Sequence, residues 1–303
     1  MQEKQSERNT MKKHTLILIT LVVLISAFGC GREINTPIQD PDKLSISVSI
    51  LPQAFFVEQI AGDLAEVNVM VGPGDDPHAY EPTPEQMRQL EKADIYFSIG
   101  VEFESVWLPR FQNTNRDLLI IDAAEGVERI PMAGGHADED HGELDPHIWL
   151  SPTRVNLIAQ NIAESLVKYD PLNSELYQNN LETFLENIES LNDYIHTKLD
   201  GITNRHFLTY HPAWGYFAND YDLEMIAIEV GGQEPGAESM AETLDLMRQY
   251  QLEEIFIQKE FSGKSAQAIA DISGASVVVL DPLAYDWLVN LRQMADEFAA
   301  ALQ

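Results

Sequence analysis

The sequence predicts an α/β fold with two lobes, each built around a parallel sheet and joined by one long rigid helix. Short apolar strands alternate with helical patterns from Lys43 onward, which is typical of βα units. The strands fall into two groups of four, and one long amphipathic segment separates the groups. At 303 residues the chain also exceeds the usual size of a single hydrophobic core. We therefore expect two α/β lobes.

The eight predicted strands are short apolar runs. The first group lies at 44–51, 67–71, 94–100 and 118–122, and the second at 206–210, 224–229, 254–258 and 276–281. The run LSISVSIL alternates strictly between apolar and polar residues, which is the two-residue period of a strand. Each group provides enough strands for one sheet.

Residues 174–201 predict the long helix. Apolar residues recur there at steps of three and four, the spacing of one helix face: Tyr177, Leu181, Phe184, Ile188, Leu191, Ile195 and Leu199. Pro171 lies before this segment and Gly201 ends it, as helix start and stop signals require. At 1.5 Å per residue, roughly 26 residues extend about 39 Å. A helix of that length braces both lobes and limits hinge motion between them.

The charge of the chain is strongly negative. There are 49 acidic against 19 basic residues, a formal net charge of −30. Such a surface repels the phosphates of nucleic acids and anionic lipid headgroups, so we expect neither as a partner. Cations are the natural counterpart, although a general solubility or high-salt adaptation accounts for the composition equally well.

The N-terminus has the layout of a secretory signal at residues 1–30. Lys12 and Lys13 precede about fourteen mostly apolar residues that end at Gly29-Cys30. That run is too short to span a bilayer comfortably. Cys30 is the only cysteine, so no disulfide holds the fold, and its position resembles the lipid-modified cysteine of bacterial lipoproteins. Lipid anchoring and simple secretion both place the protein outside the cytoplasm, either in the periplasm or anchored to a membrane.

Candidate metal ligands follow the predicted strands. In parallel α/β sheets, ligands bind beyond the carboxyl ends of the strands. Five polar residues fall there, from both lobes: His78, His147, His211, Glu260 and Asp281. A single histidine or carboxylate in such a place is more often a hydrogen-bonded loop residue or a helix cap. The repeated placement favours one metal site in the cleft between the lobes.

The loops that carry His78 and His147 each lead into a predicted helix that begins with a capping residue and a proline. Thr83-Pro84 has Gln86 three residues after the cap, and Ser151-Pro152 starts the next helix in the same way. Asp281 before Pro282 is open to the same interpretation, as a helix cap rather than a ligand. These signals place the two loops just before helix starts.

The other histidines are interpreted separately. His136 and His141 lie in AGGHADEDHGE, which has no strand pattern and no apolar anchor. A solvated acidic loop is the simpler interpretation, and a loop that collects divalent ions weakly is the alternative. We expect His196 and His206 to be structural.

The segments PHAYEPTP, DPHIWLSP, HPAWGYF and LDPL together resemble the zinc-binding, ZnuA-like solute-binding proteins of metal ABC transporters, in the TroA-like superfamily. The resemblance covers residues 44–303. It implies two (βα)4 lobes joined by one long helix, with one metal ion between them. It also implies a protein that is not an enzyme, captures Zn2+ and delivers it to a membrane permease for zinc uptake.

Carried over residue by residue, the resemblance implies four site residues. His78 and His147 match the two ligands of the first lobe and His211 the third. Asp281 matches the carboxylate that completes or adjoins the site, and Glu260 matches a position that lines it. The family's zinc members often have a long His-rich acidic insertion before the second ligand, and the loop at His136 and His141 is a short version.

Zinc is the expected metal. Neutral imidazoles suit zinc, whereas manganese favours harder oxygen ligands, and manganese-binding relatives tend to have a carboxylate where this chain has His211. Copper would also bind three imidazoles strongly. The alternatives are a manganese- or iron-binding protein of the same fold, an added adhesin role, and a zinc hydrolase with Glu260 as general base.

The domain organisation follows from these segments. We expect a signal peptide at 1–30, a tether at 31–43, a first lobe at 44–173, the linking helix at 174–201 and a second lobe at 202–303. Nothing in the sequence indicates obligate oligomerisation, so we expect a monomer.

Overall fold

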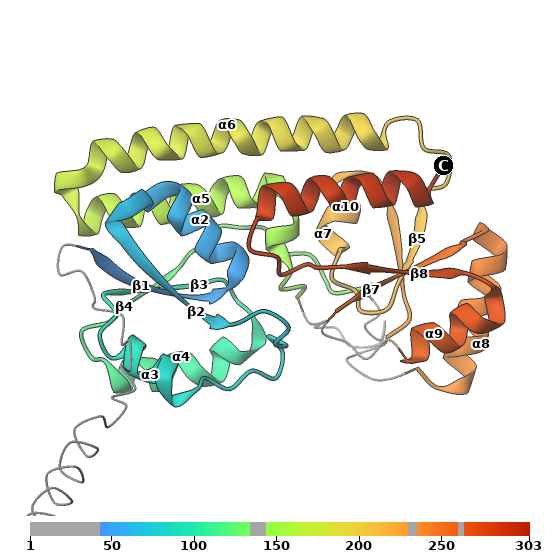
Figure 1. Cartoon of the computed structure of the whole chain (residues 1–303), viewed down its shortest axis with the longest axis horizontal. Helices are drawn as coiled ribbons and strands as arrows, with labels where there is room; N and C mark the ends of the chain where they lie inside the picture. Colours follow the sequence, from blue (N-terminus) through green and yellow to red (C-terminus); the bar gives the residue numbers. More distant parts are fainter. Residues whose placement is uncertain (1–42, 134–143, 230–234, 260–263) are drawn as a thin grey trace, which may run out of the picture. The chain divides into compact units, whose positions relative to one another are not determined.

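Eight strands form two separate four-stranded sheets, as the sequence predicts (Figure 1). The computed structural model describes residues 43–133, 144–229, 235–259 and 264–303, and residues 42–303 form one compact unit. The first sheet contains β1 (Leu44–Ile50), β2 (Ala65–Val71), β3 (Ile95–Ser98) and β4 (Leu119–Asp122). The second contains β5 (His206–Thr209), β6 (Glu224–Ala227), β7 (Glu254–Gln258) and β8 (Ser276–Leu280).

The two sheets have the same topology. The strand order is β2-β1-β3-β4 in one and β6-β5-β7-β8 in the other, and all pairs are parallel. In register, Ile46 of β1 lies opposite Val67 of β2 and Ile95 of β3. In the first sheet β1 connects to β2 on one side, whereas its neighbour β3 connects to β4 on the other side, and β5 and β7 repeat this arrangement in the second sheet. This reversal of strand order opens a crevice at the carboxyl ends of the strands, which is where α/β proteins bind ligands.

Helices surround both sheets. Those of the first half are α2 (Leu51–Ala61), α3 (Pro84–Leu90), α4 (Glu102–Thr114) and α5 (Pro152–Tyr169), with short 3-10 turns η1 (Gly62–Leu64), η2 (Ile148–Leu150) and η3 (Pro171–Asn173). Those of the second half are α6 (Ser174–Leu199), α7 (Gly215–Asp220), α8 (Ala237–Tyr250), α9 (Lys264–Ser273) and α10 (Trp287–Ala301). Thr83 and Ser151 cap α3 and α5 as predicted, each accepting a backbone N–H with its hydroxyl oxygen.

The predicted long helix is α6, which has 26 residues. Six of the seven residues of its apolar stripe are buried, and Leu181 is partly buried. The stripe packs against α2, α5 and α10, so α6 runs alongside helices that belong to both sheets (Figure 1). Its length and its burial agree with the predicted bracing role.

One continuous hydrophobic core connects the two sheets. It includes residues of the first sheet such as Phe97, and residues of the second sheet such as Phe207. Two buried tryptophans join the halves directly: Trp149 Nε1 donates to Pro282 O at 2.8 Å, and Trp287 Nε1 donates to Trp149 O at 2.6 Å. A smaller second cluster lies between the second sheet and helices α8 and α9. The shared core restrains the lobes against each other, and the predicted boundaries between them stay predictions.

The alternation in β1 does not separate a buried face from an exposed one. Ser47 and Ser49 are both fully buried, because β1 is a central strand covered on both faces. Ser49 Oγ bonds to Tyr96 Oη at 2.7 Å and also donates to the buried carboxylate of Glu104. Burial of Glu104 outweighs its hydrogen bonds and raises the pKa of that carboxyl to about 7.

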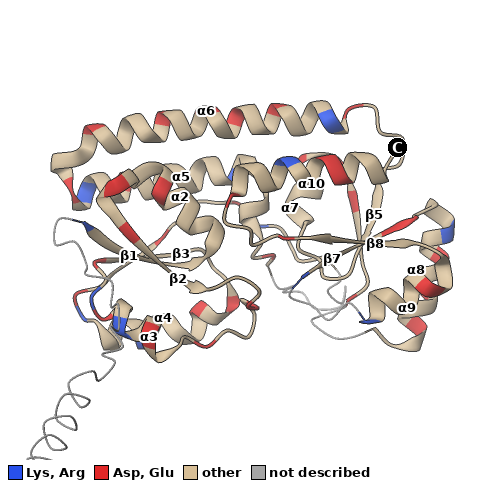
Figure 2. Ribbon diagram, in the orientation of Figure 1, with Lys and Arg blue, Asp and Glu red and all other residues tan. Residues whose placement is uncertain are grey.

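Acidic residues are spread over both lobes and along α6 (Figure 2), and those of α6 are exposed. This even distribution agrees with a solvated surface. Among the described residues, no helix combines the length and hydropathy that a bilayer span requires. The predicted signal peptide, Cys30 and residues 31–42 of the predicted tether lie outside the described residues.

The packing of α6 predicts the effect of shortening a core side chain. Leu191 is completely buried, so Leu191→Ala should lower the free energy of unfolding by about 2–5 kcal/mol. Leu176 of the same helix is 40% exposed, and Leu176→Ala should change it by about 0.5 kcal/mol or less. Urea denaturation followed by circular dichroism measures both. Equal losses in the two variants would contradict the assigned buried face.

Candidate metal centre

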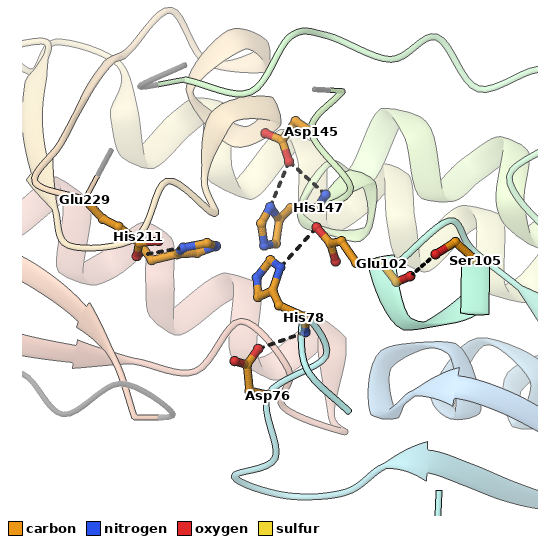
Figure 3. A network of polar contacts seen from close by, with 8 residues as sticks. All are labelled: Asp76, His78, Glu102, Ser105, Asp145, His147, His211 and Glu229. Atoms are coloured by element: carbon orange, nitrogen blue, oxygen red, sulfur yellow. Dashed lines mark hydrogen bonds and ion pairs between the residues drawn. The ribbon is translucent and has the colours of Figure 1, made fainter. Parts of the chain in front are cut away.

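Three histidines that are far apart in the sequence meet in one place (Figure 3). His78 lies in the loop between β2 and α3, His147 directly precedes η2, and His211 follows β5. One ring nitrogen from each lies within 4.8 Å of the others. The ring centroids are 4.8 Å apart for His78 and His211, 5.2 Å for His147 and His211, and 5.9 Å for His78 and His147. The structure therefore gathers the three predicted histidines from both lobes.

Each of the three imidazoles is paired with its own carboxylate through Nδ1 (Figure 3). The pairs are His78 with Glu102 Oε1 at 3.0 Å, His147 with Asp145 Oδ1 at 2.8 Å, and His211 with Glu229 Oε2 at 3.1 Å. A carboxylate that accepts from Nδ1 places the ring proton there, which leaves the lone pair on Nε2. Carboxylate pairing of this kind is how proteins orient histidines that bind metal through Nε2.

Backbone contacts fix the loops that carry the histidines. Asp76 Oδ1 accepts the backbone N–H of His78 at 2.9 Å, and Asp145 Oδ1 accepts that of His147 at 2.8 Å. Thr209 Oγ1 donates to the carbonyl of His211 at 3.0 Å. These bonds limit how far each ring can move from its neighbours.

The three histidines differ in burial. The side chains of His147 and His211 are each 4% exposed, whereas that of His78 is 26% exposed. Burial alone would lower the pKa of His78, but the hydrogen bond and charge of Glu102, helped by Asp76 and Glu229, outweigh burial and raise it above 6.5.

The pKa of His211 shifts the other way. Burial lowers it below 6.5, the nearby His147 and His78 lower it further, and Glu229 opposes the shift without cancelling it. His211 is therefore held neutral at pH 7. A neutral imidazole is the form that binds a metal ion.

Asp281 lies outside this group of three. Its Oδ2 forms an ion pair with Lys259, and its Oδ1 accepts the backbone N–H of Leu283 at 3.0 Å. The alternative role as a helix cap is not found either, because α10 begins at Trp287 and is capped by Asp286. A ligand role for Asp281 stays a prediction.

The other predicted candidates fall into two classes. Glu260, His136 and His141 lie outside the described residues. His206 Nε2 contacts Glu224 at 3.0 Å and its ring stacks on Tyr250, while His196 packs its ring against Tyr221. Both contacts agree with the expected structural roles.

The sequence interpretation missed the three carboxylate partners, although two of them carry the signal that it used for the ligands. Glu102 follows β3 and Glu229 ends the predicted strand at 224–229, so both lie at carboxyl ends of strands. Asp145 stands two residues before His147, in the segment DPH. Ligands of parallel sheets lie beyond the carboxyl ends of the strands, and this strand-end rule, applied to every acidic residue, would have found Glu102 and Glu229.

Comparison with known proteins gives a family and related structures. The family described as zinc-uptake complex component A, periplasmic (ZnuA) matches residues 46–301. The zinc-binding lipoprotein AdcA of Streptococcus pneumoniae (strain ATCC BAA-255 / R6) is 30% identical over 284 residues, covering 90% of this chain and 56% of the relative. This chain thus spans little more than half the length of that relative.

Two further similarities bear on the metal and the fold. The manganese-binding lipoprotein MntA of Halalkalibacterium halodurans (strain ATCC BAA-125 / DSM 18197 / FERM 7344 / JCM 9153 / C-125) is 26% identical over 271 residues, covering 88% of each chain. A crystal structure of ZnuA superposes with a TM-score of 0.82 at 42% identity, covering 86% of this chain and all of that one. The two-lobed α/β fold predicted from the sequence is thereby confirmed.

The opposite pKa shifts predict separate titrations of His78 and His211 in the metal-free protein. His78 should titrate above pH 6.5 and His211 below it, as followed by the ring carbon-bound proton signals in NMR spectra. Glu102→Gln removes the charge that stabilises protonated His78, so it should lower the pKa of His78. Unchanged titration of His78 in that variant would show that Glu102 is not its main partner.

Proposed function

Because this chain belongs to the ZnuA family of zinc-uptake components, we propose that it captures Zn2+ outside the cytoplasm and delivers it to the permease of an ABC transporter. The observation that carries this proposal is the meeting of three histidines from both lobes, each with Nδ1 held by a carboxylate. The carboxylates orient the three rings within one site. It binds and releases an ion, and no catalytic step is required of it.

We propose that the Nε2 atoms of His78, His147 and His211 are the metal ligands. The three paired carboxylates supply negative charge near the ion without occupying its coordination positions. Three protein ligands leave a fourth position for water or another oxygen donor. Of the sites that the described residues form, this is the one that gathers three such ligand atoms.

We propose zinc rather than manganese as the cargo. Relatives of this chain include proteins named for either metal, so family membership alone leaves the metal open. Three imidazole nitrogens suit zinc, and manganese prefers carboxylate and carbonyl oxygens. The group that the described residues form consists of three imidazoles, and Asp281 is paired with Lys259.

The place and partners of the protein follow from the same proposal. A signal peptide at 1–30 would export the chain, and acylation of Cys30 or simple release would leave it outside the cytoplasm. The partner is the permease of the transporter, and contact with the membrane itself would be limited to a lipid anchor at Cys30. We propose that the protein acts as a monomer.

Calorimetric titration of the metal-free protein with Zn2+ and with Mn2+ tests this function. The wild type should bind one Zn2+ tightly and Mn2+ at least about tenfold more weakly. His211→Ala should abolish tight Zn2+ binding, because only two imidazoles remain. His196→Ala, an exposed histidine of α6, serves as the control and should bind like the wild type. Preference for Mn2+, or indifference to His211→Ala, would contradict the proposal.

The same titration distinguishes the role of Asp281. If Asp281 stays with Lys259, Asp281→Ala should weaken Zn2+ binding by less than about threefold, far less than His211→Ala does. A loss comparable with that of a histidine variant would instead make Asp281 the fourth ligand. That result would also require the ion pair with Lys259 to open when the metal binds.

A further inference from the structure

The carboxylate of Asp145 is the most enclosed part of the candidate metal centre. Asp145 is fully buried, and its Oδ1 receives both the backbone N–H and the ring Nδ1 of His147, each at 2.8 Å. Its other oxygen, Oδ2, has no hydrogen-bond partner among the residues that the structure describes. Because Oδ2 forms no hydrogen bond of this kind with the described residues, packing against neighbouring atoms must keep this half of the carboxylate in place.

One close neighbour of Oδ2 comes from the other lobe. Gly215, the first residue of α7, lies so close that a Cβ added to it would be 2.5 Å from Asp145 Oδ2. Alanine is the better helix former by up to about 1 kcal/mol, but only glycine leaves room for the carboxylate. The backbone of α7 therefore forms the wall against which Asp145 rests.

The next residue of α7 holds the same segment by hydrogen bonds. Tyr216 Oη donates to the carbonyl of Asp145 at 2.7 Å and accepts the backbone N–H of Ile130 at 3.2 Å. Asp145 N in turn donates to Ile130 O at 2.9 Å. The Arg154 guanidinium lies over the Tyr216 ring, 4.4 Å from its centroid. The first turn of α7 thus contacts both backbone segments that position Asp145.

We propose that Gly215 and Tyr216 are positioning residues that set the orientation of His147 through Asp145, so that metal affinity depends on the contact between the lobes. Both residues act on His147 through Asp145. His147 is thereby held by its own lobe and by the lobe that provides His211. This inference rests on the proposed function, because it concerns affinity for the same metal ion.

The arrangement couples two events. Any displacement of α7 from Asp145 removes the wall at Gly215 and the hydrogen bond from Tyr216, which loosens the partner of His147. By thermodynamic reciprocity, metal binding at His147 strengthens the contact between α7 and Asp145. A permease that shifted one lobe slightly against the other would lower the affinity for the metal without opening the whole cleft.

Gly215→Ala tests the proposal. The added Cβ should displace Asp145 and weaken Zn2+ binding by about tenfold or more, the usual effect of disturbing the partner of a metal-binding histidine. Gly236→Ala is the matched control, because a Cβ there meets nothing within 4 Å, and it should bind like the wild type. Thermal melting of each metal-free variant establishes that the fold is retained.

Two readouts separate positioning from a general loss of structure. In the wild type, ring nitrogen NMR shifts should show His147 protonated at Nδ1, and Gly215→Ala should shift it toward a mixture of tautomers. In an Asp145→Ala background there is no carboxylate to displace, so adding Gly215→Ala should weaken Zn2+ binding no further. A further tenfold loss in that background would overturn the proposal.

Tyr216→Phe provides a second test if Gly215→Ala does not fold. It keeps the ring beneath Arg154 and removes only the hydroxyl, so it should weaken Zn2+ binding by about threefold or more. Wild-type affinity in Tyr216→Phe and in a folded Gly215→Ala would overturn the proposal while leaving the metal site intact. Failure of the wild type to bind Zn2+ would instead overturn the proposed function.

Discussion

The candidate metal centre depends on one constraint: three imidazoles must lie side by side, neutral, with the same ring nitrogen of each available to one ion. Positive imidazoles would repel one another at ring distances near 5 Å. A carboxylate bound to each Nδ1 orients the ring so that Nε2 is available to the ion. It also adds negative charge, which a divalent cation then balances. Much of the surrounding structure brings these six side chains together from loops on two sheets.

The helices and the shared core hold the two sheets in a fixed relation, so that the three histidines meet. The carboxyl ends of strands from two separate sheets can contribute to one site only if the positions of the sheets relative to each other are fixed. The long helix α6, packed on α2, α5 and α10, provides one restraint. The bonds that join Trp149 to Pro282 and Trp287 provide another, close to the site itself. Together these restraints limit how far one sheet can move against the other.

Acidic residues serve two different purposes in this chain. Most lie on the surface of both lobes, where water solvates them and no single one determines the fold (Figure 2). A few are buried and specific: Asp145 and Glu229 hold histidines, and Glu104 anchors the loop after β3 by accepting the backbone N–H groups of Ile99 and Gly100. The net charge of the chain is therefore no guide to the site, whereas burial is.

The sequence by itself determined the eight strands, the start of α6, the caps at Thr83 and Ser151, and the placement of three histidines after strands. These features follow from local periodicity and from the strand-end rule, which need no knowledge of distant contacts. The tertiary structure alone decided which carboxylate meets which imidazole, that Asp281 pairs with Lys259, and that Gly215 of one lobe supports Asp145 of the other. Such pairings depend on where loops from different parts of the chain pass in space, and no sequence spacing encodes that.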